Sequence, residues 1–179
     1  MNDTICAPAT ATGGATAVIR ISGPQALTIA EAVFSKPLRQ AEHGRALYGH
    51  ILRPDHTPLD QVILTPFRAP HSYTGEDTVE ISCHGSAYIV RETLRLLTEA
   101  GCRIAHPGEY TRRAFTNGKM DLSQAEAVAD LVSATNAAQH QAAFSQLRGS
   151  IRTLLSTLNA QLLELTSLLE LELDFAEHE

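Results

Sequence analysis

The first 105 residues contain several short segments in which apolar and polar side chains alternate. In residues 16–22 (TAVIRIS), Ala17, Ile19 and Ile21 occupy every second position. Successive side chains of a β-strand point to opposite faces of the sheet, so this period of two predicts a strand. It also places Arg20 on the face opposite the isoleucines, where its charge can face a cleft or solvent.

Residues 78–83 (TVEISC) follow the same pattern. Val79, Ile81 and Cys83 share one face of the predicted strand, and Glu80 lies on the other. We therefore expect Glu80, like Arg20, to point away from the core.

Other segments fit the same mixed architecture. Ser22 can cap a helix that begins at Pro24, and Gly101 has the position of a left-handed residue after a helix. The remaining pattern predicts strands at 3–7, 45–53, 61–68 and 102–105, and helices at 24–34, 86–100 and 109–116. These elements indicate an α+β domain with a mixed sheet over residues 1–119.

From Asp121 onward the pattern changes to that of a long helix. Apolar residues recur at steps of three and four, and Gly149 is the one interior glycine of the leucine-rich part. The stripe consists of Leu147, Ile151, Leu154, Leu158, Leu162, Leu165 and Leu169, widened by Leu155, Leu163, Leu168 and Leu171. So wide a stripe predicts a helical bundle, over residues 120–179, that is incomplete in this chain.

Charge separates the same two regions. Residues 1–119 hold 12 Lys/Arg and 11 Asp/Glu, whereas residues 120–179 hold 2 and 9. A general phosphate-binding surface needs clustered cations, and no basic run is present. If RNA is a substrate, other parts must help to hold it.

Cysteine and histidine spacing gives little support for a disulfide framework or a metal site. Cys6, Cys83 and Cys102 are odd in number and lack paired spacing, and the eight histidines are scattered. No secretory leader and no membrane-length apolar run is found. We expect a reducing, cytoplasmic setting, no metal and no membrane association.

Three short motifs could carry chemistry, but for each of them the sequence favours an interpretation without a catalytic or binding role. Gly118-Lys119 is followed by Met120, so no phosphate-binding P-loop is present and this chain should not hydrolyse GTP. Cys83 and His84 are neighbours on a strand, whose side chains diverge, which disfavours a nucleophile and base pair. The 74–77 loop (TGED) is favoured as a turn over a calcium or phosphate site.

Three longer motifs resemble the MnmE (TrmE) family of tRNA modification GTPases. They are DTICAPATATGGATAVIRISG at 3–23, SYTGEDTVEISCHG at 72–85 and PGEYTRRAFTNGKMDLSQAEAVADL at 107–131. The resemblance covers the chain to about Asp174-Phe175. It implies an N-terminal domain similar to the folate-binding domains of aminomethyltransferases, followed by the first helices of a helical domain.

The resemblance also implies a ligand and its contacts. The family's N-terminal domain binds 5-formyltetrahydrofolate as a stand-in for the 5,10-methylene donor, and its contact residues match Arg20, Glu80 and Lys119. A carboxylate suits the adjacent N–H donors of a pterin, and cations suit the carboxylates of the glutamate tail. No catalytic residue is expected in this part. The alternative is that Arg20 and Glu80 form only a cross-strand ion pair.

For the whole protein, the resemblance implies a GTPase that uses GTP, Mg²⁺ and K⁺. With the FAD-containing partner MnmG, it would add an aminomethyl or carboxymethylaminomethyl group to C5 of the wobble uridine in tRNA. The N-terminal domain would form a homodimer. The GTPase domain, the remaining helices and a C-terminal cysteine motif would lie beyond Glu179.

One departure from the family concerns the loop at Ala11-Thr12-Gly13-Gly14, which is shorter than the usual PPGRGG-like sequence. Two alternatives therefore remain. The chain could be an assembly module that dimerises without folate, or a stand-alone folate-dependent aminomethyltransferase-like enzyme. A P-loop encoded downstream would exclude the second, and the unpartnered leucine stripe already disfavours it.

Overall fold

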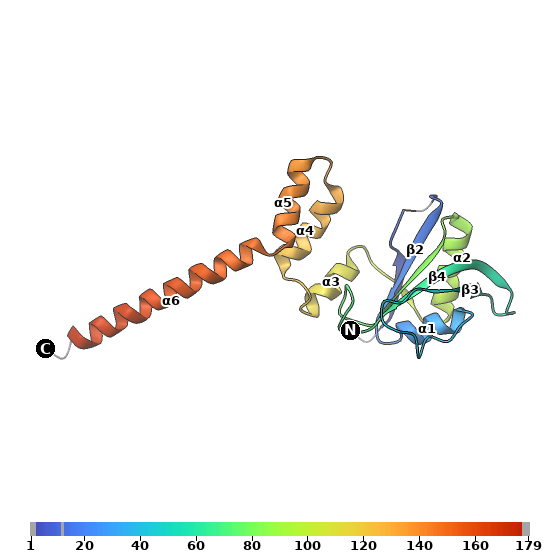
Figure 1. Cartoon of the computed structure of the whole chain (residues 1–179), viewed down its shortest axis with the longest axis horizontal. Helices are drawn as coiled ribbons and strands as arrows, with labels where there is room; N and C mark the ends of the chain where they lie inside the picture. Colours follow the sequence, from blue (N-terminus) through green and yellow to red (C-terminus); the bar gives the residue numbers. More distant parts are fainter. Residues whose placement is uncertain (1–2, 12, 177–179) are drawn as a thin grey trace. The chain divides into compact units, whose positions relative to one another are not determined.

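A computed structural model describes residues 3–11 and 13–176 and divides into two compact units. The N-terminal unit comprises Met1–Lys119, and the C-terminal unit comprises Met120–Glu179. Figure 1 shows the helices and strands of both units in chain order.

The N-terminal unit is built on a six-stranded mixed sheet with the order β3-β4-β5-β2-β1-β6. Its strands are β1 (Ile5–Pro8), β2 (Thr16–Ser22), β3 (Leu47–Leu52), β4 (Pro58–Phe67), β5 (Thr78–His84) and β6 (Arg103–Ile104). Only the β1/β6 pair is parallel among these strands. The predicted α+β class with a mixed sheet is confirmed.

Helices α1 (Ala26–Val33) and α2 (Ala87–Glu99) pack against one face of this sheet and against each other (Figure 1). The apolar positions of the alternating strands point into this layer, where Ile19, Ile21 and Ile81 are fully buried. Because those residues occupy every second position, their neighbours face the other side. The prediction that Arg20 and Glu80 lie opposite the core face is thereby confirmed.

The opposite face carries a row of side chains across four strands. Tyr48 on β3 pairs with Ile63 on β4, Ile63 with Ser82 on β5, and Ser82 with Val18 on β2. Tyr48 and Ile63 are 57% and 47% exposed. We call this surface the open face of the sheet; it also carries Arg20 and Glu80, two residues along their strands from Val18 and Ser82.

Ser22 does not cap the first helix, and that expectation is wrong. The hydroxyl of Thr4 accepts the hydrogen bond from the Gln25 amide, 3.0 Å away, at the start of α1. Ser22 is buried, and its hydroxyl instead bonds Thr74 and Glu76, at 2.7 and 2.8 Å. The side chain therefore ties β2 to the loop that precedes β5.

The long helix expected from Asp121 onward is broken at two places, so that prediction needs correction. Among the described residues of the C-terminal unit, the helices are α4 (Leu122–Ser133), α5 (Ala137–Leu147) and α6 (Ser150–Ala176). The side chain of Asn136 accepts a hydrogen bond from the amide of Gln139 and so begins a new helix. Gly149 has φ +75°, which ends the regular helix between α5 and α6.

The leucines of α6 are exposed wherever the structure describes them. Leu154, Leu162 and Leu163 are all more than 60% exposed. The side chains of Ile151 and Leu171, which belong to the predicted stripe, lie outside the described part. Within residues 3–11 and 13–176, no helix combines the length and apolar character needed to cross a membrane.

Candidate functional site

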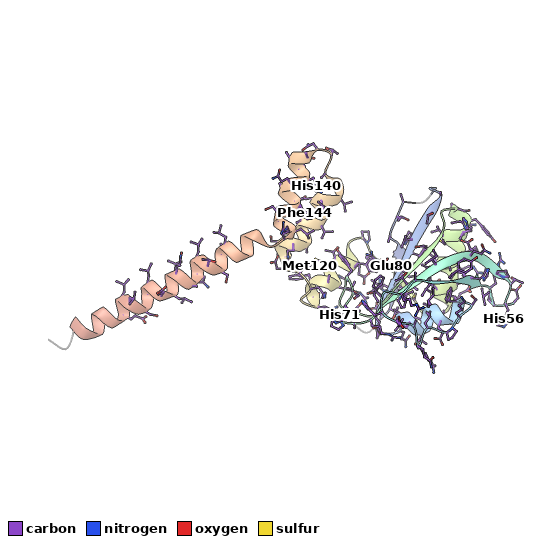
Figure 2. The ribbon with its side chains drawn as sticks, viewed as in Figure 1. His56, His71, Glu80, Met120, His140 and Phe144 are labelled. Atoms are coloured by element: carbon purple, nitrogen blue, oxygen red, sulfur yellow. The ribbon has the colours of Figure 1, made fainter. Side chains whose placement is uncertain are left out.

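Arg20 and Glu80 lie directly opposite each other on neighbouring antiparallel strands. The β2/β5 register pairs residue 20 with residue 80, and Figure 2 labels Glu80 within the sheet. The Nε and Nη2 groups of Arg20 both donate to Oε1 of Glu80, at 2.9 and 2.7 Å. The structure therefore brings two of the three expected site residues together.

Part of this ion pair is open to a ligand. The side chains of Arg20 and Glu80 are 25% and 30% exposed. Among the described residues, no hydrogen-bond donor reaches Glu80 Oε2, and no acceptor reaches Arg20 Nη1. A carboxylate oxygen and a guanidinium N–H are thus available side by side, so the pair can accept and donate hydrogen bonds at once.

Two tyrosines surround the guanidinium of Arg20. Its carbon Cζ lies 5.3 Å from the ring centroid of Tyr73 and 5.6 Å from that of Tyr110. Tyr73 belongs to the loop between β4 and β5, and Tyr110 belongs to α3 (Glu109–Thr116). No local sequence pattern connects either ring with Arg20, although both rings lie inside the family-like motifs at 72–85 and 107–131.

Lys119 lies near the same loop but is not joined to the ion pair. Its Nζ donates to the carbonyl of Pro70 at 3.0 Å, and its backbone amide bonds the carbonyl of Ala114. The aliphatic stem passes Gly75 so closely that a Cβ there would lie 3.1 Å from Lys119 Cγ. Among the described residues, no hydrogen bond or ion pair links Lys119 to Arg20 or Glu80.

A buried charge cluster anchors α3 beside this site. Arg113 is 1% exposed and forms ion pairs with Asp3, Glu76 and Glu109, at 2.8, 3.2 and 3.2 Å. Arg103 binds Asp3 and Glu109 as well, each at 2.6 Å. This cluster was not predicted, although the four-residue spacing of Glu109 and Arg113 on one helix is a local signal for an ion pair.

The cluster shifts the pKa of Glu109. The hydrogen bond from Arg103 lowers the pKa of Glu109 to about 2, against the opposing effect of burial. The amide of His106 and the guanidinium of Arg113 act in the same direction as Arg103. Glu109 is therefore an ionised structural residue over the physiological pH range.

Cys83 and His84 point in different directions, as the strand alternation predicted. Cys83 is buried, and burial together with the Asp60 carboxylate raises its pKa to about 11. His84 is exposed, and its Nδ1 pairs with Asp60 Oδ1 at 2.7 Å. The thiol has neither the acidity nor the neighbour that a nucleophile needs.

Arg20, Glu80 and Lys119 are not among the lining residues of two cavities of about 300 Å³ each. One is in the N-terminal unit, between α1, the β3–β4 turn and the end of α2.

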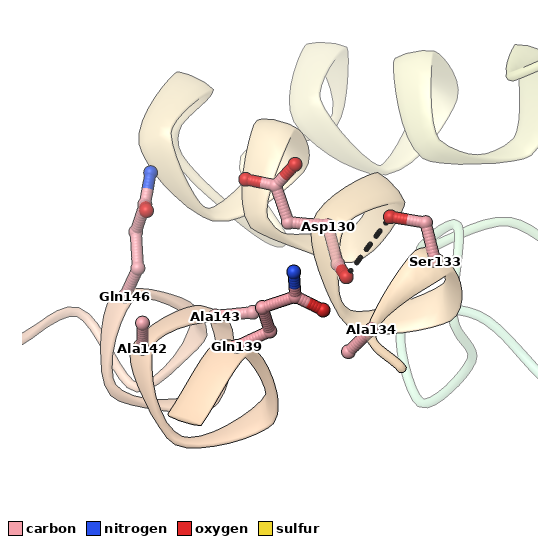
Figure 3. Close-up of a pocket in the computed structure, with 7 residues that line it drawn as sticks. All are labelled: Asp130, Ser133, Ala134, Gln139, Ala142, Ala143 and Gln146. Carbon is pink, nitrogen blue, oxygen red and sulfur yellow. Dashed lines mark hydrogen bonds between the residues drawn. The ribbon is translucent and has the colours of Figure 1, made fainter. Parts of the chain in front are cut away.

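The other cavity lies between α4 and α5 in the C-terminal unit (Figure 3). It is lined by Asp130, Ser133, Ala134, Gln139, Ala142, Ala143 and Gln146. Ser133 donates within it to the carbonyl of Asp130. Neither lining concentrates charge in the manner of the Arg20–Glu80 pair.

The short loop before β2 is held against the end of β5. The amide of Gly13 donates to the carbonyl of Gly85, and the amide of Gly85 donates to the carbonyl of Ala15, both at 3.1 Å. Thr12 lies outside the described residues. The family-like contacts that a longer loop would make remain a prediction.

Each of the two units matches a known protein-family model. Residues 4–119 match the family model described as GTP-binding protein TrmE N-terminus, and residues 122–179 match the MnmE helical domain. The chain belongs to the MnmE family. Its two units are therefore the N-terminal and helical domains of an MnmE protein, and the predicted family membership is confirmed.

Curated MnmE relatives align along almost the entire chain. The tRNA modification GTPase MnmE of Bacteroides fragilis is 53% identical over 182 residues, which cover 99% of this chain and 39% of the relative. The namesake proteins of Parabacteroides distasonis and Flavobacterium johnsoniae are 55% and 51% identical, over 98% and 99% of this chain. The chain thus spans about two fifths of the length of these relatives.

Proposed function

We propose that this chain is the folate-binding and dimerisation part of a tRNA-modifying GTPase. In this proposal Arg20, Glu80 and Lys119 contact a tetrahydrofolate derivative, in the 5-formyl or 5,10-methylene form. The MnmE family membership supports the proposal, and the observation that carries it is the partly exposed Arg20–Glu80 pair on the open face of the sheet.

Glu80 has the chemistry to recognise the pterin edge. The ring presents adjacent N–H donors, and Oε2 of Glu80 is not engaged by any described residue. Oε1 already accepts from both Nε and Nη2 of Arg20, so Oε2 is the oxygen that accepts from the pterin. Arg20 holds the carboxylate in place and contributes Nη1 as a further donor for a carbonyl or an anionic group of the ligand.

Lys119 is suited to a more distant part of the ligand. Its Nζ now bonds a backbone carbonyl, and an ammonium group has three donors, so two remain for a carboxylate. The absence of a direct link to Glu80 fits an elongated ligand, whose pterin and glutamate ends require separate contacts. The 68–77 loop contacts both groups, Lys119 through the carbonyl of Pro70 and Arg20 through the ring of Tyr73.

The open face also supports a homodimer. Tyr48 and Ile63 expose apolar surface on β3 and β4, the first two strands of the sheet, on a face where a single soluble domain normally has polar residues. A second copy packed on this face would cover these residues and enclose the ligand beside Arg20. A Lys substitution at Ile63 should then yield monomers in light scattering, whereas Ile104→Lys, at an equally exposed position on β6, should leave the dimer intact.

For the intact protein we propose GTP hydrolysis with Mg²⁺ and K⁺, and partnership with MnmG on tRNA. The product would be an aminomethyl or carboxymethylaminomethyl group on C5 of the wobble uridine. The folate would supply the carbon. A cytoplasmic location fits the three free cysteines, all of which are buried.

Calorimetry with 5-formyltetrahydrofolate tests the folate site. We expect the chain to bind, and Glu80→Gln to weaken binding by about 10- to 100-fold, because an amide replaces one acceptor with a donor. Arg20→Ala should also weaken it. Glu99→Gln, on the exposed end of α2, is the matched control and should bind like the wild type.

Two outcomes would favour the alternatives. A stable dimer that releases no heat with folate, even at high ligand concentration, would support an assembly module. One-carbon transfer by this chain without GTP would support a stand-alone aminomethyltransferase-like enzyme. Equal affinity of the wild type, Arg20→Ala and Glu80→Gln would reject this location of the site.

A further inference from the structure

The guanidinium of Arg20 is held by rings from two segments that are distant in sequence. Tyr73 comes from the loop before β5, and Tyr110 comes from the first turn of α3. Each ring centroid lies within 6 Å of Arg20 Cζ, at 5.3 and 5.6 Å. This is the range in which the negative ring face attracts a cation, and the attraction grows as the site loses water.

Tyr110 also forms a hydrogen bond with the backbone of Arg20. Its hydroxyl donates to the carbonyl of Arg20 at 2.6 Å. Burial raises the pKa of Tyr110 far above neutrality, so the hydroxyl keeps the proton that it donates. One side chain therefore fixes both the main chain of Arg20 and one side of its guanidinium.

Tyr73 is tied to the same helix. Its hydroxyl shares a hydrogen bond of 2.9 Å with the hydroxyl of Thr111. Three residues further along the loop, Glu76 pairs with Arg113, which lies three residues after Tyr110 on α3. These contacts join the loop to the helix, so the two rings belong to one connected support for Arg20.

We infer that Tyr73 and Tyr110 are positioning residues that hold Arg20 in the geometry used for ligand binding. With both rings in place, Nε and Nη2 face Glu80 Oε1, while Nη1 and Glu80 Oε2 stay available. An arginine without such support has several free torsions, and ordering it on binding costs affinity. The inference rests on the proposed folate site, because that ligand is what the oriented pair would bind.

A pair of substitutions at Tyr73 separates the contribution of the aromatic ring from that of the hydroxyl. Tyr73→Leu removes a ring that is 36% exposed, so folding should survive, and Tyr73→Phe keeps the ring but loses the bond to Thr111. Tyr110→Phe removes only the bond to the Arg20 carbonyl. Tyr88→Leu is the matched control, because Tyr88 lies at 5.7 Å from Arg91 on α2.

The direct readout is the Arg20 Nε–H signal in ¹⁵N NMR, recorded without ligand. We expect slow solvent exchange in the wild type and in Tyr73→Phe, and clearly faster exchange in Tyr73→Leu. Affinity for 5-formyltetrahydrofolate should fall about three- to tenfold in Tyr73→Leu and about threefold in Tyr110→Phe. Tyr73→Phe and Tyr88→Leu should stay within about twofold of the wild type.

The two readouts keep the inference distinct from the proposed function. A wild-type chain that binds no folate rejects the function, while the NMR comparison still decides whether the rings position Arg20. Unchanged Arg20 exchange in Tyr73→Leu would overturn the inference, even if folate binds. Thermal unfolding of each variant shows whether a loss follows from stability instead.

Discussion

Arg113 and Glu76 form an ion pair of 3.2 Å between the last turn of α3 and the loop that precedes β5. The Arg113 side chain is 1% exposed and the Glu76 side chain 14%. Glu76 also accepts a hydrogen bond from Ser22 on β2. This one contact therefore connects the strand of Arg20 with both segments that supply the tyrosines.

Replacement of Arg113 by methionine should destabilise the N-terminal unit by about 3 kcal/mol, because Glu76 and Glu109 would keep buried charges without their shared partner. Arg112→Met is the control, since that side chain is 58% exposed and should cost less than about 0.5 kcal/mol. Urea unfolding measures both. If the unfolding free energy of Arg113→Met falls no more than the small amount expected for Arg112→Met, the buried cluster adds no stability.

Glu109 should make stability depend on pH in the acid range. Its pKa is lowered from 4.5 to about 2 in the folded chain, so its contribution is complete above pH 4.5 and disappears as pH falls towards 2. In Glu109→Gln this dependence should be weaker. Urea unfolding at several pH values tests this, and a constant difference between wild type and variant would contradict it. Asp3, whose pKa is also lowered by Arg103, will retain part of the effect.

Gly85 should not tolerate alanine. A Cβ at this position would lie 2.0 Å from the carbonyl oxygen of Gly14, so the loop before β2 would have to move. We expect a loss of about 1–3 kcal/mol in unfolding free energy. Gly14→Ala is the control, because its nearest neighbour, the carbonyl of Thr16, is 3.7 Å away. If Gly85→Ala is as stable as Gly14→Ala, the loop does not pack as described.

The three thiols should react slowly in the native chain. Cys6, Cys83 and Cys102 are all at most 7% exposed, and the pKa of Cys83 is raised to about 11 by burial and the Asp60 carboxylate. Its thiolate fraction at pH 8 is then about 100-fold below that of a free thiol. Labelling with a chromogenic disulfide reagent, before and after denaturation, measures this. A thiol that reacts rapidly in the native chain would contradict the burial.

Local patterns predicted much of the N-terminal unit because their information is contained in neighbouring residues. The strand at 16–22 and the helix at 109–116 have the predicted bounds, and α2 falls within one residue of its predicted ends. The strand β4 starts earlier than expected, at Pro58. The start of a strand depends on the neighbour with which it pairs. The pairing of β4 with β3 begins at Pro58, which lies opposite Leu52 of β3.

The helical region was less predictable from its apolar period. Alanine- and leucine-rich sequence continues the helical pattern through both breaks, so the period alone gave one helix where the structure has α4, α5 and α6. The signals for the breaks were single residues. Asn136 offers the side-chain cap that begins α5, and Gly149 adopts a left-handed conformation that ends the regular helix after α5.

The site shows the same division. The sequence by itself determined that Arg20 and Glu80 face away from the core, because strand periodicity is local, and its motifs identified the MnmE family. Only the tertiary structure decided that Arg20 lies opposite Glu80, 60 residues away, and that Tyr73 and Tyr110 flank its guanidinium. Register and packing between distant segments are set by the core as a whole, so no local pattern specifies them.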